Sequence, residues 1–472
     1  MADGTTGSAV PGAGGERIAR AAHGQELVWL TGRRSQGLLL QHVADTFRLG
    51  AAIDEARLRA ALGELAARHT ALRTSLRVLG GGLRQVVHPR IDLPVEFTDL
   101  GGPDDGKRAE RLAELADQAV AQPFNPGRAP LWRAVAVRLG EADWAVVLVA
   151  HQLVCDQASL FLLNAELAEL CAASEQGRAP VLPEPPMDFA SYADHQHAGP
   201  GAERRAQDDE FWRQQLDGLP HGHGIPLDRP RPAVPAFAAA EVRSELPPGL
   251  PAALRTGADR LDAAPAVLLL AAYAALLHDR SGRTDHGIGV PVSGRHRPET
   301  LSLVGALAGT VVLRLDTSGD PAFAELVDRA RGVASAAWEH QDQAFRPARQ
   351  IAFTLTDGPD PGPPCGFAED DLLLEVAGRA ARLVYDPALF APATARGLLD
   401  DYLALLAAAL AEPATPLSLL LSLLPGAAAT RPPRPAHDER TAGSPAGGRG
   451  PSGPEAPHGG RAAPSVLLRS TT

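Results

Sequence analysis

Residues 150–160, with the sequence AHQLVCDQASL, bring together side chains that could do chemistry. His151 and Asp156 stand five residues apart, and an imidazole with a carboxylate is a common arrangement for general acid–base catalysis. Gln152 and Gln157 carry neutral amides, which form hydrogen bonds but cannot take up a proton near neutral pH. The segment therefore allows two hypotheses, a catalytic pair or a structural pair beside a site that has no base.

The elements around this segment place it at the end of a strand. Residues 131–140 and 143–151 have the pattern of two paired strands around a short turn with Gly140, and residues 158–176 return to a helical period. A strand–loop–helix junction commonly presents polar side chains to a cleft. Cys155 has no basic neighbour in the sequence that would lower its thiol pKa, so we expect a small core residue there.

Helical and strand-like patterns alternate along the chain and predict a mixed α/β fold. A helix is expected over residues 54–76, where Leu and Ala recur at steps of three and four. Further along the chain, the same reasoning predicts helices at 264–282, 322–341 and 393–412, and strands at 286–293, 309–316, 348–357, 370–378 and 381–387. Two mixed halves of similar make-up favour a pseudo-twofold arrangement with a cleft between them.

Length and composition indicate how the chain is divided. A chain of 472 residues is too long for one comfortable core, so two halves are expected, at 19–180 and 181–424, with a Pro-rich connection near the boundary. Residues 425–472 are rich in Pro, Gly, Ala and Arg and cannot bury enough apolar surface to offset their chain entropy. We predict that this segment and the similar residues 1–18 are disordered tails.

Charge, hydropathy and cysteine content exclude several classes of protein. The net charge of −11 and the lack of a dense Lys/Arg block argue against a nucleic-acid partner. No apolar run approaches the roughly 18 residues of a membrane span and the N-terminus does not resemble a secretory signal, so we expect a cytoplasmic protein with no membrane partner. The three cysteines, Cys155, Cys171 and Cys365, are scattered and do not have the spacing of metal ligands. We therefore expect no metal site and no disulfide.

Several ordered blocks of the sequence resemble the condensation domains of nonribosomal peptide synthetases. They are ELAARHTALRTSL, QPFNPGRAPLWRAVAVRL, LVAHQLVCDQASLFLLNAEL, DFASYADHQ, EFWRQQL, PVSGRHRPETLSLVGALAGTVVLRLD, AWEHQDQAF and VYDPALF. The resemblance implies two chloramphenicol-acetyltransferase-like halves in a V-shaped pseudo-dimer. It also implies acyl transfer between substrates on the phosphopantetheine arms of peptidyl or acyl carrier proteins, which enter a tunnel between the halves, with no metal and no bound cofactor.

The sequence departs from this family at the family's signature, His-His-x-x-x-Asp-Gly, which reads HQLVCDQ here. Gln152 stands at the second histidine, which the family uses to activate the acceptor or to position the tetrahedral intermediate. Gln157 stands at the glycine, where a side chain would narrow the approach of a ligand or alter the turn. His151 and Asp156 match family positions whose role is largely structural.

The resemblance also implies a partner for Asp156. The family's aspartate pairs with an arginine of the other half, and Arg295 in SGRHRPE is the candidate here. Gly309, in GALAGTVVLR, stands where the family has an asparagine that faces the tunnel. The segment 357–369 is shorter than the family's crossover between the halves, so the contacts along the substrate channel are expected to differ as well.

These departures predict a stand-alone, condensation-domain-like protein of nonribosomal peptide or related natural-product biosynthesis that lacks normal base-assisted condensation. It would meet carrier proteins in trans and act in binding or in the recruitment of a tailoring enzyme. The recruitment domains of glycopeptide synthetases likewise keep the first histidine and the aspartate and lose the second histidine and the glycine. The alternatives are an active condensing acyltransferase that forms an amide or ester with Gln152 positioning the reactants, or a transferase of soluble acyl-CoA.

Overall fold

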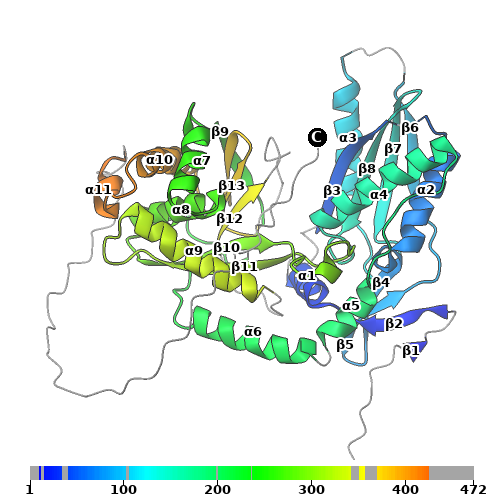
Figure 1. Ribbon diagram of the computed structural model, residues 1–472, viewed down its shortest axis with the longest axis horizontal. Helices are drawn as coiled ribbons and strands as arrows, with labels where there is room; N and C mark the ends of the chain where they lie inside the picture. The colour runs from blue at the N-terminus through cyan, green and yellow to red at the C-terminus, as the bar shows by residue number, and fades with distance from the viewer. Residues whose placement is uncertain are drawn as a thin grey trace, which may run out of the picture.

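The computed structural model describes residues 10–11, 15–34, 41–50, 52–101, 106–197, 200–234, 237–341, 350–356 and 369–424. The predicted tail 425–472, most of the predicted tail 1–18 and all but the last residue of the segment 357–369, with Cys365, lie outside the described residues. The described part of the chain forms two mixed α/β halves that lie side by side (Figure 1).

The first half is built on a four-stranded sheet with the order β3-β8-β7-β6. β3 (His42–Leu49), β8 (Asp143–His151) and β7 (Trp132–Gly140) are antiparallel neighbours, and β6 (Val95–Asp99) runs parallel to β7. The two central strands are nearly continuous runs of apolar residues because both of their faces are buried. The predicted pairing of these two strands is confirmed.

Helices cover both faces of this sheet. α2 (Glu55–Arg68) and α4 (Gln157–Gln176) pack on one face, and α3 (Arg108–Ala121) packs on the other. The prediction of one helix over residues 54–76 is wrong at its end, because His69 takes an extended conformation and a short 3-10 turn follows. Apolar spacing does not mark this break, since Ala and Leu in the 3-10 turn are buried as well.

A second, smaller sheet flanks the first half, with the order β1-β2-β5-β4. Its strands are all antiparallel to their neighbours. Their bounds are β1 (Val10–Pro11), β2 (Arg17–Arg20), β4 (Thr74–Leu79) and β5 (Gly82–Val87), with the 3-10 turn η2 (Thr70–Arg73) before β4.

The second half is a six-stranded mixed sheet that carries its own helical layer. The strands, in sheet order, are β11 (Gly309–Asp316), β10 (Asp285–Val292), β12 (Ile351–Thr356), β13 (Leu372–Ala377), β14 (Ala380–Tyr385) and β9 (Ala240–Glu245). The helices are α7 (Leu250–Arg260), α8 (Pro265–Ser281), α9 (Phe323–Glu339), α10 (Pro392–Ala411) and α11 (Leu417–Ser422), and a 3-10 turn η3 (Pro298–Thr300) follows β10. Side chains of the sheet and of these five helices form one core, so every element predicted for this half is present with its ends shifted by a few residues.

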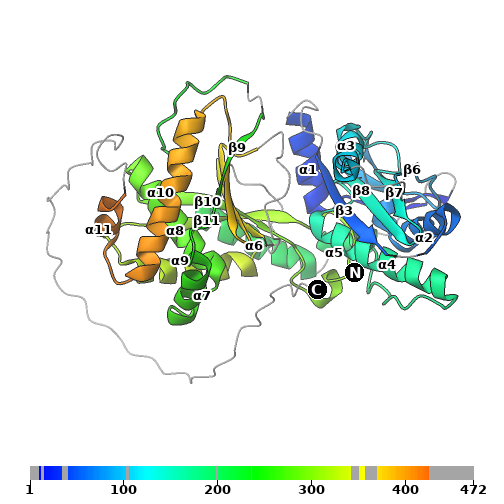
Figure 2. The ribbon, with the colours of Figure 1, turned by 90° about the horizontal axis from the view of Figure 1, so that it is seen from above.

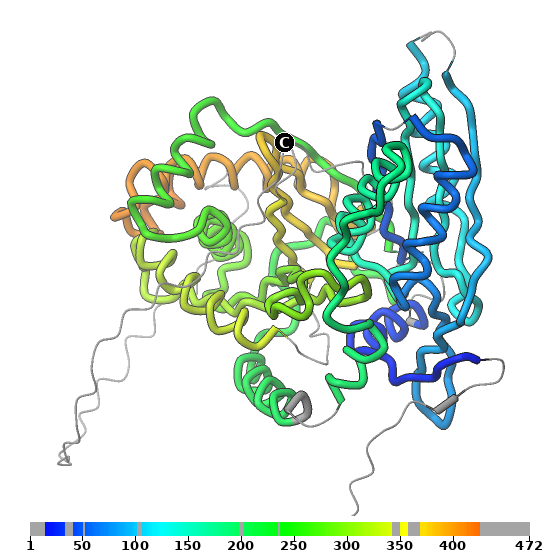
Figure 3. Tube along the Cα trace, turned by 45° about the vertical axis from the view of Figure 1, so that its right-hand side comes forward, coloured from blue at the N-terminus to red at the C-terminus, as the bar shows by residue number. Residues whose placement is uncertain are grey.

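Three helices lie where the halves approach each other. α1 (His23–Arg34) lies on the side of the first half that faces the second (Figures 1 and 2). α5 (Phe189–Gln196) packs into the core of the first half, although the predicted boundary at residue 180 lies before it. α6 (Pro200–Leu216) then leads to the second half and lies along the lower edge of the molecule (Figure 3).

The halves are also joined by a segment that crosses between their cores. Leu303, Val304, Ala306 and Leu307 lie between β10 and β11 of the second half, yet their side chains pack in the core of the first half. Among the described residues, no helix taken singly has the length and apolar character to cross a membrane. Of the helices that the structure describes, only α7 and α8 taken as a pair reach that length and composition, and they meet at a bend of 103°.

Candidate functional site

The segment 150–160 forms the predicted strand–loop–helix junction. His151 is the last residue of β8, and its backbone N–H donates to the carbonyl of Leu131 at 2.9 Å. Asp156 is the N-cap of α4, where its carboxylate accepts from the backbone N–H of Ser159 at 2.8 Å. The strand end and the helix start therefore fix the positions of the two ionisable residues.

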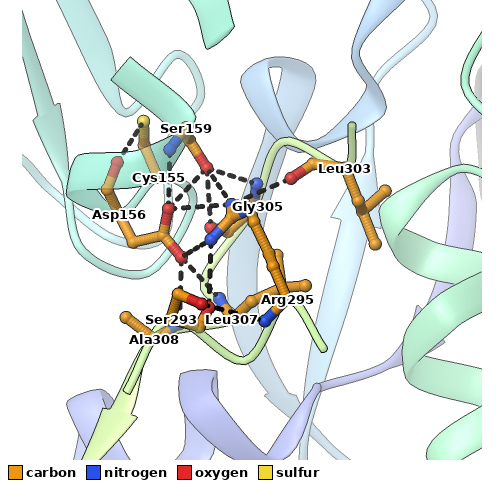
Figure 4. Close-up of polar contacts among 9 residues, drawn as sticks. All are labelled: Cys155, Asp156, Ser159, Ser293, Arg295, Leu303, Gly305, Leu307 and Ala308. Carbon is orange, nitrogen blue, oxygen red and sulfur yellow. Dashed lines mark hydrogen bonds and ion pairs between the residues drawn. The ribbon is translucent and has the colours of Figure 1, made fainter. Parts of the chain in front are cut away.

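Asp156 and Arg295 form a buried ion pair between the halves (Figure 4). Nη1 of Arg295 lies 2.8 Å from Oδ2 of Asp156, and Nη2 lies 2.9 Å from Oδ1. The two hydrogen bonds make the pair bidentate, which fixes the orientation of the guanidinium relative to the carboxylate. Both side chains are less than a tenth exposed, at 7% for Arg295 and 8% for Asp156.

Backbone and hydroxyl groups complete this arrangement, which we call the brace (Asp156, Ser159, Arg295 and the backbone of 303–308). The N–H groups of Leu307 and Ala308 donate to Oδ2 of Asp156 at 3.1 and 2.9 Å. The hydroxyl of Ser159 lies 2.7 Å from Oδ1 of Asp156 and accepts from Arg295 at 2.8 Å. Each buried charge is thus paired and hydrogen-bonded, which is the condition for such a pair to be tolerated.

A cavity of about 300 Å³ lies beside the brace, between the two halves. Its described lining residues come from α1 (His23, Gly24, Leu27, Val28), β3 (Val43), the junction (Gln152, Asp156, Gln157), α5 (Tyr192, Gln196), the start of β11 and the segment before it (Ala306, Leu307, Ala308, Gly309, Thr310) and the residue after the C-cap of α9 (Gln341). Of the predicted site residues, Gln152, Asp156, Gln157 and Gly309 meet here. His151 and Arg295 are not among the residues that line it.

His151 packs on the face of the sheet that carries α3. Its Nδ1 accepts from the backbone N–H of Leu153 at 3.1 Å, and its ring lies against those of His42 and Phe124. Burial, and to a smaller extent the neighbouring His42, lowers the pKa of His151 from 6.5 to about 3. The imidazole is therefore neutral at pH 7 and holds the loop rather than a substrate proton.

Asp156 cannot serve as a base although it lines the cavity. Six donors among the described residues approach its two oxygens: two from Arg295, two from Ser159, and the N–H groups of Leu307 and Ala308. A carboxylate has about four lone-pair sites, so no site is left for a proton from a ligand. Its role here is to join α4 of the first half to the segment before β11.

Gln152 and Gln157 are the two amides of the junction that face the cavity. Gln152 is half-buried, and Gln157 is exposed at the first position of α4. The backbone of Gln157 is not among those with positive φ, so this position does not require glycine for its conformation. The glutamine therefore occupies this turn without the strain of a left-handed backbone, and its side chain forms part of the cavity wall.

Gly309 leaves open space in the cavity wall. It is the first residue of β11, and a Cβ placed on it would meet only Cγ2 of Val292, at 3.6 Å. That separation is an ordinary van der Waals contact, so a side chain would fit at this position. The glycine therefore adds room to the cavity and removes a side chain that could bind a ligand.

Cys155 lies behind the junction and takes no part in the cavity. It is fully buried, and burial followed by the nearby Asp156 carboxylate raises the pKa of its thiol well above 9.0. Its thiol donates to the carbonyl of Asp156 at 3.5 Å. The prediction of a small core residue is confirmed.

Sequence reasoning missed the residues of α1, α5 and the end of α9 in the cavity wall. DFASYADHQ has the pattern of a surface helix, whereas Tyr192 and Gln196 from that segment line the cavity. His23 also lines it, but its Nε2 accepts from Arg205 at 3.2 Å and its Nδ1 is buried. For α5 and Gln341 the only available signal was the resemblance of DFASYADHQ and AWEHQDQAF to a family, and for α1 there was none, because helical spacing alone does not show which face meets a cleft.

Within the described part of the chain, the junction therefore presents no group suited to accept a proton, and the one imidazole of the cavity wall, His23 of α1, has its Nε2 engaged by Arg205. The carboxylate is saturated, the nearby imidazole of His151 is neutral and turned away, and the remaining polar side chains of the junction are amides. The described residues also contain no group of three His, Cys, Asp or Glu side chains that could hold a metal ion. The arrangement can bind and orient a ligand through hydrogen bonds.

Comparison with known proteins identifies the fold that builds this site. A family model described as the condensation domain matches residues 16–349. The chain belongs to the condensation domain family. This membership, together with the two halves seen in Figure 1, confirms the predicted α/β architecture of two acetyltransferase-like halves in a V.

Curated relatives of this condensation domain are large synthetases. Phosphinothricin tripeptide synthetase PhsC of Streptomyces viridochromogenes is 33% identical over 351 residues, which are 71% of this chain and 32% of the synthetase. Chondramide synthase cmdD of Chondromyces crocatus is 31% identical over 394 residues, 76% of this chain and 10% of that protein. The chain thus spans a third or less of the length of these relatives.

Two solved structures cover most of both chains. The X-domain in a structure titled as the complex of the X-domain and OxyB from teicoplanin biosynthesis has a TM-score of 0.72 and 25% identity, over 85% of this chain and 95% of that one. SgcC5 from Streptomyces globisporus has a TM-score of 0.67 and 29% identity, over 80% and 94%. The first of these neighbours was solved in complex with OxyB, and the second in complex with (R)-(-)-1-(2-naphthyl)-1,2-ethanediol and sucrose.

Proposed function

We propose that this condensation-domain protein binds carrier-borne substrates in nonribosomal peptide or related natural-product biosynthesis without base-assisted condensation. The observation that carries the proposal is the cavity of about 300 Å³, whose described lining has amides where a base would be needed. Condensation domains act on substrates held on phosphopantetheine arms, and the cavity between the halves could bind the end of such an arm.

The intact brace supports binding as the retained function. Asp156 and Arg295 keep a two-point ion pair with both side chains buried, although the residues facing the cavity differ from the family signature. An unpaired buried charge costs about 3–5 kcal/mol, so the brace maintains the V between the halves. A chain that only needs to bind its partners still needs this geometry.

The partners we propose are peptidyl or acyl carrier proteins, and a tailoring enzyme as a further partner. The similarity to an X-domain that was solved in complex with OxyB supports the latter, because the two chains align over nearly their full folded length. A recruitment role would place the carrier and the second enzyme on one condensation-domain surface.

The alternative function is an active condensing acyltransferase that forms an amide or ester. The observation that favours it is that Gln152 and Gln157 face the cavity, where they could orient a thioester and an acceptor. Holding two reactants together can lower a barrier by about 7–11 kcal/mol, against the roughly 10²–10⁴-fold of general-base catalysis. A reactive amine could therefore condense on positioning alone.

One experiment separates binding from turnover. The protein is titrated with carrier proteins loaded with acyl or peptidyl thioesters, binding is followed by fluorescence anisotropy, and products with amine or alcohol acceptors are followed by mass spectrometry. Saturable binding with product formation at the uncatalysed rate supports the proposal. Product formation well above that rate would establish the acyltransferase instead, and no binding to any carrier would contradict both.

A further inference from the structure

The cavity is lined by neutral polar groups rather than by free charges. Its described lining contains no Lys, Arg or Glu, and its one carboxylate, Asp156, is saturated by donors of the brace. Four of the lining residues are glutamines, at positions 152, 157, 196 and 341, and they come from separate elements of both halves. Apart from His23 and Asp156, the described wall therefore carries no side chain that is charged near neutral pH.

The four glutamines differ in how their amides are used. Gln196 accepts from the backbone N–H of His23 at 3.2 Å and donates to the hydroxyl of Tyr192 at 3.0 Å. Gln341 donates to the carbonyl of Trp338 at 2.9 Å. These two amides are therefore parts of the wall.

Gln152 and Gln157 are the contrasting pair. Neither side chain makes a hydrogen bond to any residue that the structure describes, and both face the cavity from the two ends of the junction loop. Each primary amide offers two N–H donors and one carbonyl acceptor. The described residues therefore leave both amides open to a ligand.

We infer that Gln152 and Gln157 bind the secondary amides of an uncharged peptidyl group, so that the cavity selects a carried peptide over a carried alkyl chain. This inference rests on the proposed function. A peptide unit presents one N–H and one C=O, which match the carbonyl and the N–H of a glutamine side chain. Leu27, Val28 and Val43 supply apolar wall for the carbon atoms between successive amides.

The selectivity follows from what each ligand leaves unpaired. A peptidyl group replaces the water on both glutamines with equivalent hydrogen bonds, whereas an alkyl chain displaces that water and offers nothing in return. Because Gln152 is half-buried and Gln157 is exposed, the effect per side chain is moderate. We expect a change of about three- to tenfold in affinity for each glutamine.

The test uses two non-hydrolysable thioether analogues of acyl pantetheine that share one pantetheine portion. One carries an N-acetyl-diglycyl group and the other an unbranched alkyl group of equal length, and the dissociation constants are measured by calorimetry. Gln152→Leu and Gln157→Leu each weaken binding of the peptidyl analogue about three- to tenfold and leave the alkyl analogue unchanged or more tightly bound. Gln118→Leu, an exposed position on α3, is the matched control and changes neither constant.

Three results would overturn the inference. An equal loss for both analogues would assign the two glutamines to the shared pantetheine portion, and no loss for either would remove them from recognition. Binding of loaded carrier proteins without binding of either analogue would also contradict it while leaving the proposed function intact. Because thioethers cannot react, catalytic turnover by the wild type would contradict the proposed function and leave this measurement valid.

Discussion

The brace and the cavity wall use neighbouring residues of one short loop in opposite ways. On the brace side, the Asp156 carboxylate and the Arg295 guanidinium are buried and joined by two hydrogen bonds. On the cavity side, the amides of Gln152 and Gln157 make no hydrogen bond to any described residue. The difference separates two roles along one loop: the brace holds the two halves together, and the proposed contact with the ligand falls to the two amides that the brace does not use.

The largest expected effect comes from breaking the brace. Asp156→Asn leaves the Arg295 guanidinium buried without a counter-charge, so we expect the free energy of unfolding to fall by about 3–5 kcal/mol. Arg295→Met should cost a similar amount, and the double variant should cost clearly less than the sum of the two. Urea unfolding of the three variants measures this coupling.

An exposed ion pair provides the control for these three variants of the brace. Arg48 and Asp143 pair at the surface with side-chain exposures of 60% and 39%, so Asp143→Asn should cost no more than about 1 kcal/mol. Equal costs for the exposed and the buried pair would mean that the brace does not stabilise the contact between the halves.

The second effect is a dependence of stability on pH through His151. Burial and His42 lower its pKa from 6.5 to about 3. Between these two pH values the imidazole of His151 is protonated in the unfolded chain and neutral in the folded protein. The free energy of unfolding therefore falls as the pH decreases from 6.5 towards 3, by roughly 1.4 kcal/mol per pH unit from this residue. His286, whose pKa burial lowers to about 4, adds a contribution of the same sign.

NMR of the wild type isolates the contribution of His151. Its ring resonances should stay constant between pH 7.5 and 5, because the imidazole remains neutral throughout that range. A titration with a midpoint near 6.5 would place the ring in water and would contradict its assignment to the buried side of the loop.

The smallest expected effect lies on the cavity side. Gln157 is helical and exposed, so Gln157→Gly should lower the free energy of unfolding by only about 0.5–1 kcal/mol, the usual cost of glycine in a helix. Thermal unfolding measures the change. Stabilisation by glycine would show that the backbone at this position is strained by a side chain.

The sequence was sufficient for much of the fold. Alternating apolar patterns located β7 and β8, and helical spacing located α4, because the packing of these elements depends on local periodicity. The sequence was insufficient where the apolar pattern continues although the structure changes. The end of α2 at Arg68 and the burial of Leu303 in the core of the other half both depend on tertiary contacts.

The candidate site likewise contains residues that the sequence located and residues that only the fold brings together. A family resemblance alone singled out Gln152 and Gln157, as the positions where it implies a histidine and a glycine, and it also named Arg295 as the partner of Asp156. Ser159, whose hydroxyl lies at 2.7 Å from the Asp156 carboxylate, is an ordinary helix residue in the sequence. Its role, like that of Tyr192 in the cavity wall, depends on which segments of distant sequence the fold brings together.

The most direct test of the central claim is the condensation rate of the wild type relative to Gln152→Ala and Gln152→His, with loaded carriers and a reactive amine. We expect the wild type and Gln152→Ala to match the uncatalysed reaction, because an amide cannot accept the proton that condensation releases. Any gain should appear only in Gln152→His, which restores a basic group facing the cavity. A wild-type rate well above the uncatalysed one that falls in Gln152→Ala would contradict the account.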